Sequence, residues 1–167
     1  MILRRTSLLI FLGLCILCIV HALYYSFLLP DNVASHFGSS GKPDAWSSRN
    51  VFITVYLVSV VMTAVIFLGI VFGIPMLPNS MINLPHKDFW LSEEKRRETF
   101  HFFFHYFLWF GSATFLLLLD IFHQSFMVHL GRAGSLQHAW LSITLYLGFS
   151  IVWTVGLFVR FMGTKEG

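Results

Sequence analysis

The chain has 167 residues, of which 56% are hydrophobic and only 11% carry a charge. A soluble domain usually contains about 25% charged residues, so the composition excludes an ordinary soluble enzyme and indicates a single integral membrane domain over residues 1–167. The net charge of +3 is small, and the basic residues flank apolar segments instead of forming a patch, which argues against a nucleic-acid partner.

Four apolar segments are each long enough to cross about 30 Å of hydrocarbon at a rise of about 1.5 Å per residue. They cover residues 6–29, 51–74, 100–122 and 139–162. These segments predict an all-α integral membrane protein, a bundle of four transmembrane helices in a lipid bilayer. The first segment lacks a small-residue cleavage motif, so we expect it to remain as a span rather than to be removed as a signal peptide.

The connection at residues 30–50 concentrates the turn-forming residues of the chain. Gly38 and Gly41 allow tight turns, and Pro43 stiffens the exit from the loop. Asp44 can accept backbone N–H bonds in a turn, and Trp46 is expected to anchor the loop at the headgroups. The stretch is either a structural loop that returns the chain to the membrane or a recognition surface for an extracellular peptide, an envelope component or a metal.

The connection at residues 75–99 begins with a proline-containing stretch and becomes helix-like from residue 88. Ser92 is followed by Glu93, Glu94 and Lys95, a pattern that predicts a helix start. We expect this helix to continue into the third span.

Lysine and arginine are distributed unequally between the two ends of the predicted bundle. Eight of them lie near the chain termini or in connection 75–99, and three lie in connections 30–50 and 123–138. The positive-inside rule then predicts that both termini and connection 75–99 are cytoplasmic, whereas the other two connections face outward.

One face of the third span carries a series of polar side chains, which we call the polar stripe. At about 100° per residue, it contains Glu98, His101, His105, Ser112, Asp120 and His123. Ionisable groups in a membrane rarely face lipid, since the cost at mid-bilayer is about 3 kcal/mol or more. We therefore expect the stripe to face the bundle interior or a water-filled cavity. Asp120 lies among leucines and needs a partner, for which Arg49, His36 and His21 are candidates.

Histidine and carboxylate residues give two candidate metal sites. His101 and His105 are spaced i, i+4 and can chelate Zn²⁺ from one helix face, or they are hydrated or hydrogen-bonded near the cytoplasmic interface. A second candidate site for a divalent metal such as zinc lies at the outer end of the third span. Its candidate ligands are His36, Asp44, Asp120 and His123. The alternatives there are a hydrogen-bonded clamp of connection 30–50 on the bundle and a proton relay.

Two residue patterns together resemble a known family. The first connection contains Pro30, His36, Phe37, Gly41, Pro43, Asp44 and Trp46 in order. The second contains Asn83, Pro85, Asp88, Trp90 and Leu91, followed by Arg96, Arg97, Glu98 and Thr99. Over residues 28–99 the chain resembles the bacterial membrane domain of unknown function number 1648, which also occurs at the N-terminus of SdpI-like immunity and signalling proteins.

The resemblance implies a multi-pass protein of the bacterial cytoplasmic (inner) membrane with binding residues in these two patterns. SdpI-like relatives protect cells from a secreted toxin and hold a repressor at the membrane. Those relatives carry further spans after this domain, and we expect the segment characteristic of SdpI to be absent here.

Catalytic triads, phosphate-binding loops and dinucleotide fingerprints are absent from the sequence, so no catalytic residue and no enzymatic activity is expected. The favoured hypothesis is a small non-enzymatic protein that senses or binds a ligand or a protein partner at its outer loop, with a regulatory or immunity-related role. The alternatives are a metal-binding or proton-coupled transporter or enzyme that uses the polar stripe, which would need to dimerise for transport, and an accessory subunit of an envelope complex. No cofactor is expected, apart from the metal alternative.

Overall fold

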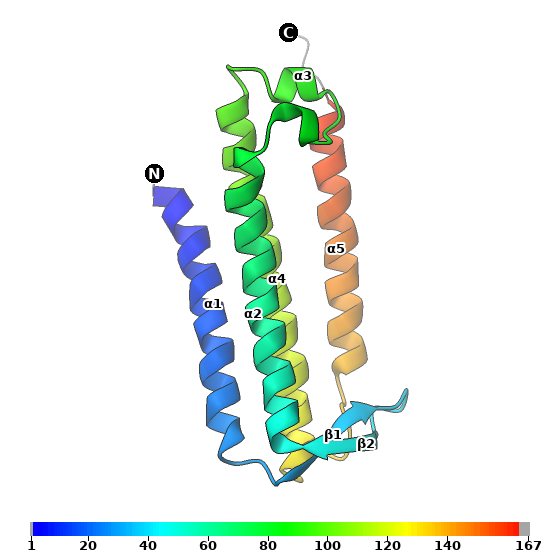
Figure 1. Cartoon of the computed structure of the whole chain (residues 1–167). Helices are drawn as coiled ribbons and strands as arrows, with labels where there is room; N and C mark the ends of the chain where they lie inside the picture. Colours follow the sequence, from blue (N-terminus) through cyan, green and yellow to red (C-terminus); the bar gives the residue numbers. More distant parts are fainter. Residues whose placement is uncertain (1, 164–167) are drawn as a thin grey trace.

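In the computed structural model, which describes residues 2–163 and side chains from Thr6 onward, four long helices lie side by side (Figure 1). The long helices are α1 (Ile2–Ser26), α2 (Arg49–Gly73), α4 (Arg96–His129) and α5 (Ala139–Met162). The shorter elements are β1 (Asn32–Phe37), β2 (Pro43–Ser48), the 3₁₀ turns η1 (Ile74–Met76) and η2 (Asn79–Met81), and α3 (Lys87–Trp90). All four long helices are long and apolar enough to cross a membrane. The prediction of four such helices is therefore confirmed.

The prediction of an all-α fold is wrong in one segment, because residues 30–50 contain an antiparallel β-hairpin. Helix boundaries also differ from those expected. Helix α1 ends at Ser26 rather than at residue 29, and α4 runs from Arg96 to His129 rather than over 100–122. At 34 residues, α4 is about 51 Å long and exceeds a hydrocarbon core of about 30 Å.

The hairpin lies at one end of the molecule together with the loop at 130–138, and we call this the hairpin end (Figure 1). The other end, which we call the terminal end, holds the start of α1, the end of α5 and the segment at 74–95 (Figure 1).

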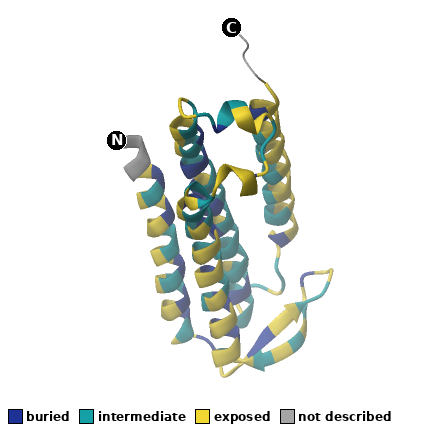
Figure 2. Cartoon of the chain, turned by 45° about the horizontal axis from the view of Figure 1, so that its top comes forward, coloured by how far each residue is buried: buried dark blue, intermediate teal, exposed yellow. Residues whose placement is uncertain are grey.

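Helices α1, α2 and α4 form a three-helix core. Their inward faces meet in one hydrophobic cluster whose large buried members include Phe11, Tyr56, Leu108, Phe115 and Phe126. The outward faces of the same helices are exposed (Figure 2), which suits contact with lipid because hydrocarbon solvates apolar side chains as well as a protein interior does.

Helix α5 packs mainly against α4, so the arrangement is a three-helix core with an attached fourth helix rather than the closed four-helix bundle that we expected. Within α5 only Ala139 and Phe161 are buried. Aromatic rings hold the two helices together: Tyr106 stacks on Trp153 with ring centroids 4.7 Å apart, and the Tyr106 hydroxyl donates to the Trp153 carbonyl. Further along, the Thr114 and Tyr146 hydroxyls are hydrogen-bonded at 2.8 Å.

The terminal end is closed by the segment at 74–95. The predicted continuous helix from residue 88 is wrong, because α3 ends at Trp90 and turns separate it from α4. Ser92 still caps the following turn, its hydroxyl oxygen accepting the Lys95 N–H at 3.4 Å. Arg96 donates to the Pro75 and Leu77 carbonyls at 3.1 and 3.3 Å, and Trp90 donates to the Phe161 carbonyl at 3.1 Å.

Gly111 of α4 lies against aromatic rings of both α1 and α2. A Cβ atom there would come within 2.6 Å of the Phe11 ring and 2.7 Å of the Phe67 ring. We expect Gly111→Ala to lower the free energy of unfolding by about 1–3 kcal/mol through overpacking. Thermal unfolding in detergent would measure the change.

The matched control is Gly148→Ala in α5, where a Cβ atom would have nothing within 4 Å. Because alanine favours a helix over glycine by about 1 kcal/mol, this variant should be unchanged or slightly stabilised. Equal melting temperatures for the two variants would contradict the close packing at Gly111.

Candidate functional site

The hairpin has a defined register and a tight turn. Strand β1 pairs antiparallel with β2 from Asn32 opposite Ser48 to Phe37 opposite Pro43, with irregularities on both sides of His36. At the tip, the Gly38 N–H donates to the Lys42 carbonyl at 2.9 Å. Gly41 has a φ of +73°, a conformation that glycine adopts without strain. The Gly41 N–H also donates to the Gly38 carbonyl at 2.8 Å, so the two glycines shape a β-turn and Pro43 begins β2.

Contacts at the tip and in the middle of the strands fasten the hairpin to the helices. At the tip, the Gly41 carbonyl accepts the Leu136 N–H at 2.9 Å, and the Ser39 carbonyl accepts the Trp140 indole N–H at 3.0 Å. In the middle, the His129 Nε2–H donates to the Ala34 carbonyl at 3.1 Å. The hairpin is therefore held against α4, the loop at 130–138 and the start of α5.

At the hairpin base, Arg49 links the start of α2 to the turn that follows α1. Its guanidinium donates to the Leu29 carbonyl at 3.0 Å and pairs with Asp31 at 3.1 Å. Arg49 was a predicted partner of Asp120, and that prediction is wrong because Arg49 is engaged here.

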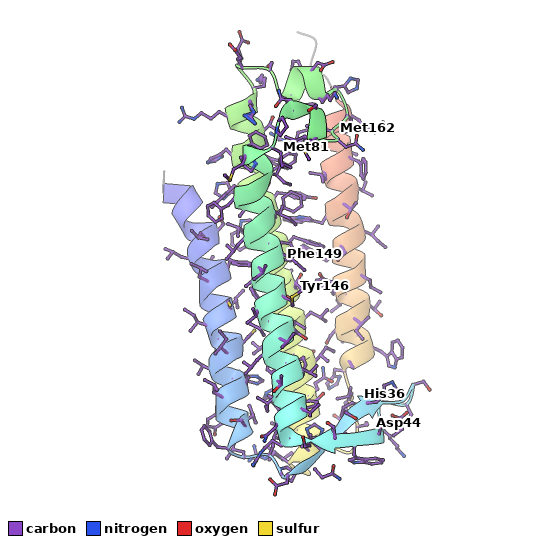
Figure 3. The ribbon with its side chains drawn as sticks, viewed as in Figure 1. His36, Asp44, Met81, Tyr146, Phe149 and Met162 are labelled. Carbon is purple, nitrogen blue, oxygen red and sulfur yellow. The ribbon has the colours of Figure 1, made fainter. Side chains whose placement is uncertain are left out.

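His36 and Asp44 form an ion pair or hydrogen-bonded pair across the two strands (Figure 3). The His36 Nδ1 atom lies 2.5 Å from the Asp44 Oδ1 atom. The side chains are 69% and 51% exposed, so the pair is open to solvent and available to a ligand. With Nδ1 engaged, the Nε2 atom of His36 is the remaining polar atom of the ring.

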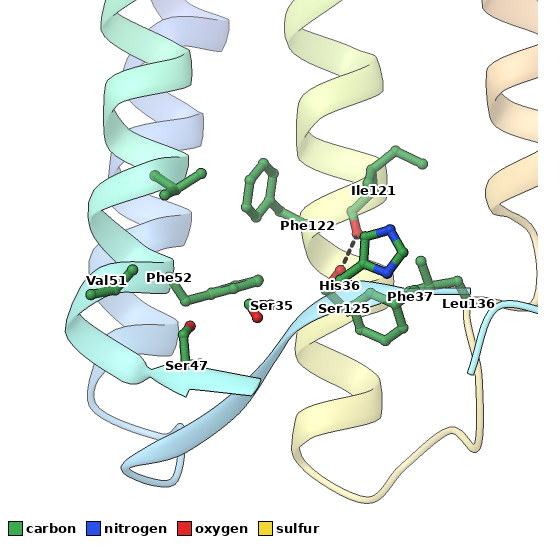
Figure 4. Close-up of a pocket in the computed structure, with 11 residues that line it drawn as sticks. Ser35, His36, Phe37, Ser47, Val51, Phe52, Ile121, Phe122, Ser125 and Leu136 are labelled. Carbon is green, nitrogen blue, oxygen red and sulfur yellow. Dashed lines mark hydrogen bonds between the residues drawn. The ribbon is translucent and has the colours of Figure 1, made fainter. Parts of the chain in front are cut away.

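A cavity of about 330 Å³ lies beneath the hairpin, between β1, β2, α2 and α4 (Figure 4). Most of its wall is apolar, with a few hydroxyl groups and His36 at one side. The lining residues are Ser35, His36, Phe37, Ser47, Val51, Phe52, Val55, Ile121, Phe122, Ser125 and Leu136. The Ser125 hydroxyl donates to the Ile121 carbonyl of its own helix at 3.0 Å. The arrangement suits an amphipathic ligand whose apolar part enters the cavity and whose polar part contacts the His36–Asp44 pair.

A second cluster of polar rings lies between α1, α2 and α4 at the same end. The His21 Nε2 and His123 Nδ1 atoms are 3.2 Å apart, and the Tyr56 hydroxyl lies 3.3 Å from the His21 Nδ1 atom. The Tyr25 and Phe126 rings are stacked beside them at 4.5 Å. His123 of the polar stripe is therefore hydrogen-bonded to His21 of α1.

Asp120 of the polar stripe also has partners, although none of those predicted. One of its carboxylate oxygens accepts from the Gln124 amide at 2.7 Å and from the Ser142 hydroxyl at 2.6 Å. Ser142 lies on α5, so the carboxylate helps to fasten α5 to α4. The predicted partners His36 and His21 are instead paired with Asp44 and His123.

The structure does not bring the four candidate metal ligands of the hairpin end together. His36 pairs with Asp44, His123 with His21, and Asp120 with Gln124 and Ser142. Within residues 2–163, no group of three or more His, Cys, Asp or Glu side chains is placed to hold a metal ion. Ser112 is buried and donates to the Leu108 carbonyl, and Glu98, His101 and His105 lie toward the terminal end.

The two predicted binding patterns lie at opposite ends of the molecule and do not form one site (Figure 3). Trp90 and Pro85 belong to the segment that closes the terminal end, where Asp88 is exposed. Asn83 lines a separate cavity of about 260 Å³ formed with η1, η2, α4 and Leu157 of α5. Of the first pattern, His36 and Phe37 line the cavity under the hairpin, whereas Trp46 is 59% exposed and lies outside its lining.

Sequence reasoning missed the helix residues of the cavity wall, chiefly Val51, Phe52 and Phe122. These are apolar positions within predicted spans, and nothing in their spacing distinguishes a cavity wall from a lipid-facing surface.

Four long apolar helices suggest a multi-pass membrane protein. Residues 13–63 match the family described as Domain of unknown function (DUF1648), and the chain carries this domain there. The match covers much of α1, the whole hairpin and the first part of α2, and so includes the first of the two patterns that carried the resemblance. The second pattern, at residues 83–99, lies outside the matched segment. No curated protein and no solved structure matches the chain.

Gly41 tests whether the hairpin depends on its attachment to the loop at 130–138. A Cβ atom at Gly41 would lie 2.9 Å from the Leu136 carbonyl oxygen, in a conformation with positive φ. We expect Gly41→Ala to detach the hairpin tip at a cost of about 1 kcal/mol or more. Faster hydrogen exchange across residues 36–44 would report the detachment.

The control for that variant is Gly134→Ala, in the loop that receives the hairpin, where a Cβ atom would have nothing within 4 Å. Hydrogen exchange of the hairpin should be unaffected by this change. Protection that is the same in both variants and the wild type would mean that the tip contact does not order the hairpin.

Proposed function

We propose that the protein is a non-enzymatic membrane protein that binds or senses an amphipathic ligand, such as an extracellular peptide, at its hairpin. The observation that carries the proposal is the cavity of about 330 Å³ beneath the hairpin. An apolar side chain entering this cavity would be removed from water, which contributes about 25 cal/mol per Å² of apolar surface.

The His36–Asp44 pair supports the same proposal. A histidine hydrogen-bonded to a carboxylate through Nδ1 has a fixed orientation, and His36 lines the cavity while its partner is half exposed. The pair can therefore bind the polar part of a ligand whose apolar part lies in the cavity. The rigid attachment of the hairpin to α4 and α5 supports binding to a preformed surface.

We further propose that the hairpin faces the outside of a bacterial cytoplasmic membrane and that both termini are cytoplasmic. The excess of basic residues at the terminal end, among them Lys87, Lys95, Arg96 and Arg97, supports this orientation under the positive-inside rule. The basic residues Arg4 and Arg5 precede the described side chains, and Lys165 lies outside the described residues.

Two exposed serines at opposite ends of the molecule test the orientation. Ser40 lies at the hairpin tip and Ser80 in η2, and both are exposed. In intact cells, a membrane-impermeant maleimide should label Ser40→Cys and should label Ser80→Cys only after the cells are permeabilised. The reverse pattern would overturn the orientation. The native Cys15 and Cys18 lie within α1, so the unsubstituted chain supplies the background.

The cavity can be filled from α2 to test the binding site. Val51 lines the cavity and is 54% exposed, whereas Val58 is 53% exposed two turns further along the same helix and does not line it. In a strain that depends on this chain for survival against an added amphipathic peptide, Val51→Trp should abolish protection and Val58→Trp should retain it. Abundance in the membrane should be equal for both variants.

Asp44→Ala extends the test to the polar half of the site. It removes the carboxylate that orients His36, and we expect reduced peptide binding to the purified protein at normal abundance. If Val51→Trp and Val58→Trp protect equally well, or if Asp44→Ala simply disappears from the membrane, the hairpin is a structural element and the proposed function is wrong.

A further inference from the structure

The terminal end carries a pair of histidines that the proposed function does not use. His101 and His105 lie one turn apart on α4, and their Nε2 atoms face each other at 3.3 Å. The ring centroids are 4.6 Å apart with an interplanar angle of 68°. The two nitrogen atoms therefore converge on one point beside the helix.

This separation allows both rings to bind one shared transition-metal ion. Imidazole nitrogens bind Zn²⁺ at about 2.0–2.1 Å, so two of them in a tetrahedral arrangement lie about 3.3 Å apart. Without a metal, the same two atoms can share one proton in a hydrogen bond. An ion would replace that proton with little movement of either ring.

A residue of α1 orients one member of the pair. The Ser7 hydroxyl is hydrogen-bonded to the His105 Nδ1 atom at 2.9 Å, and Ser7 is only 1% exposed. Histidines that bind metals usually have the second ring nitrogen hydrogen-bonded, because this bond fixes the ring and the tautomer. When Nδ1 donates to the hydroxyl oxygen, the lone pair of His105 Nε2 is directed at His101.

The position of the pair allows ions to reach it. His101 is exposed, and it lies in the second turn of a helix that is about 20 Å longer than a hydrocarbon core. One turn before it, Glu98 is engaged by Lys95 at 3.2 Å and by Arg160 at 3.9 Å. The carboxylate charge is thereby offset, so the two histidines supply the protein ligands and water the others.

We propose that His101 and His105 form a binding site for a divalent transition-metal ion at the terminal end of α4. Neutral imidazole donors select Zn²⁺, Cu²⁺ or Ni²⁺ over Mg²⁺ and Ca²⁺, which prefer oxygen ligands, and Cu²⁺ binds more tightly than Zn²⁺. Because Ser7 belongs to α1, the site also joins α1 to α4.

The test uses the full chain purified in detergent with a tag that contains no histidine. Equilibrium dialysis against Cu²⁺ or Zn²⁺ is compared for the wild type, the double variant His101→Gln/His105→Gln, and the control His21→Gln/His123→Gln. The control removes the other close histidine pair, at 3.2 Å across α1 and α4. The wild type and the control should bind one equivalent of Cu²⁺, and the double variant should bind it at least about tenfold more weakly.

Electron paramagnetic resonance of the Cu²⁺ complex supplies a readout that does not depend on affinity. The spectrum of the wild type should show coupling to two imidazole nitrogens, and this signal should be missing from His101→Gln/His105→Gln. Ser7→Ala should retain the two-nitrogen signal with affinity lowered about tenfold, because an orienting hydrogen bond is lost. Copper binding that survives in the double variant, or that is lost in the control instead, would overturn the proposal.

Discussion

Helix α4 governs the structure because its polar side chains need partners inside the protein. In hydrocarbon no water is present to satisfy a hydroxyl, imidazole or carboxylate. The partners come from two different helices: Ser7 and His21 of α1 meet His105 and His123, and Ser142 of α5 meets Asp120. Helix α2 contributes the Tyr56 hydroxyl beside His21. These polar contacts join α1 and α5 to α4 in addition to the hydrophobic cluster of the three-helix core.

This constraint explains which parts of the fold could be predicted. Apolar length is a local property, so the four long helices follow from the sequence alone. The face of the polar stripe follows from helical periodicity. Its partners do not, because several hydroxyl-bearing residues on the other helices satisfy their own backbone instead. Ser59 and Thr63 of α2, for example, donate to the carbonyls of Val55 and Ser59, and only the packing decides between such alternatives.

The hairpin was missed for a different reason. Its strands have only six residues each, and they contain several serines and a proline around a glycine-containing turn, so the segment resembles a loop in sequence. What stabilises it is tertiary: the Leu136 N–H, the Trp140 indole and the His129 imidazole all donate to its backbone carbonyls. A two-stranded hairpin alone is marginally stable in water, so these tertiary hydrogen bonds are needed to keep the strands paired. The family pattern in this segment could identify its residues without revealing these contacts.

The same contacts also join the hairpin to the start of α5. The hairpin tip is bonded to Leu136 and Trp140, and two residues further on Ser142 is bonded to Asp120 of α4. Gln124 joins this network from both sides, because its amide donates to Asp120 and its carbonyl accepts the His138 N–H. A displacement of the hairpin would therefore reach the start of α5 as well as α2 and α4, which the hairpin contacts directly. Since α5 is attached chiefly through α4 and buries few residues of its own, it is the long helix whose displacement disturbs the fewest core contacts.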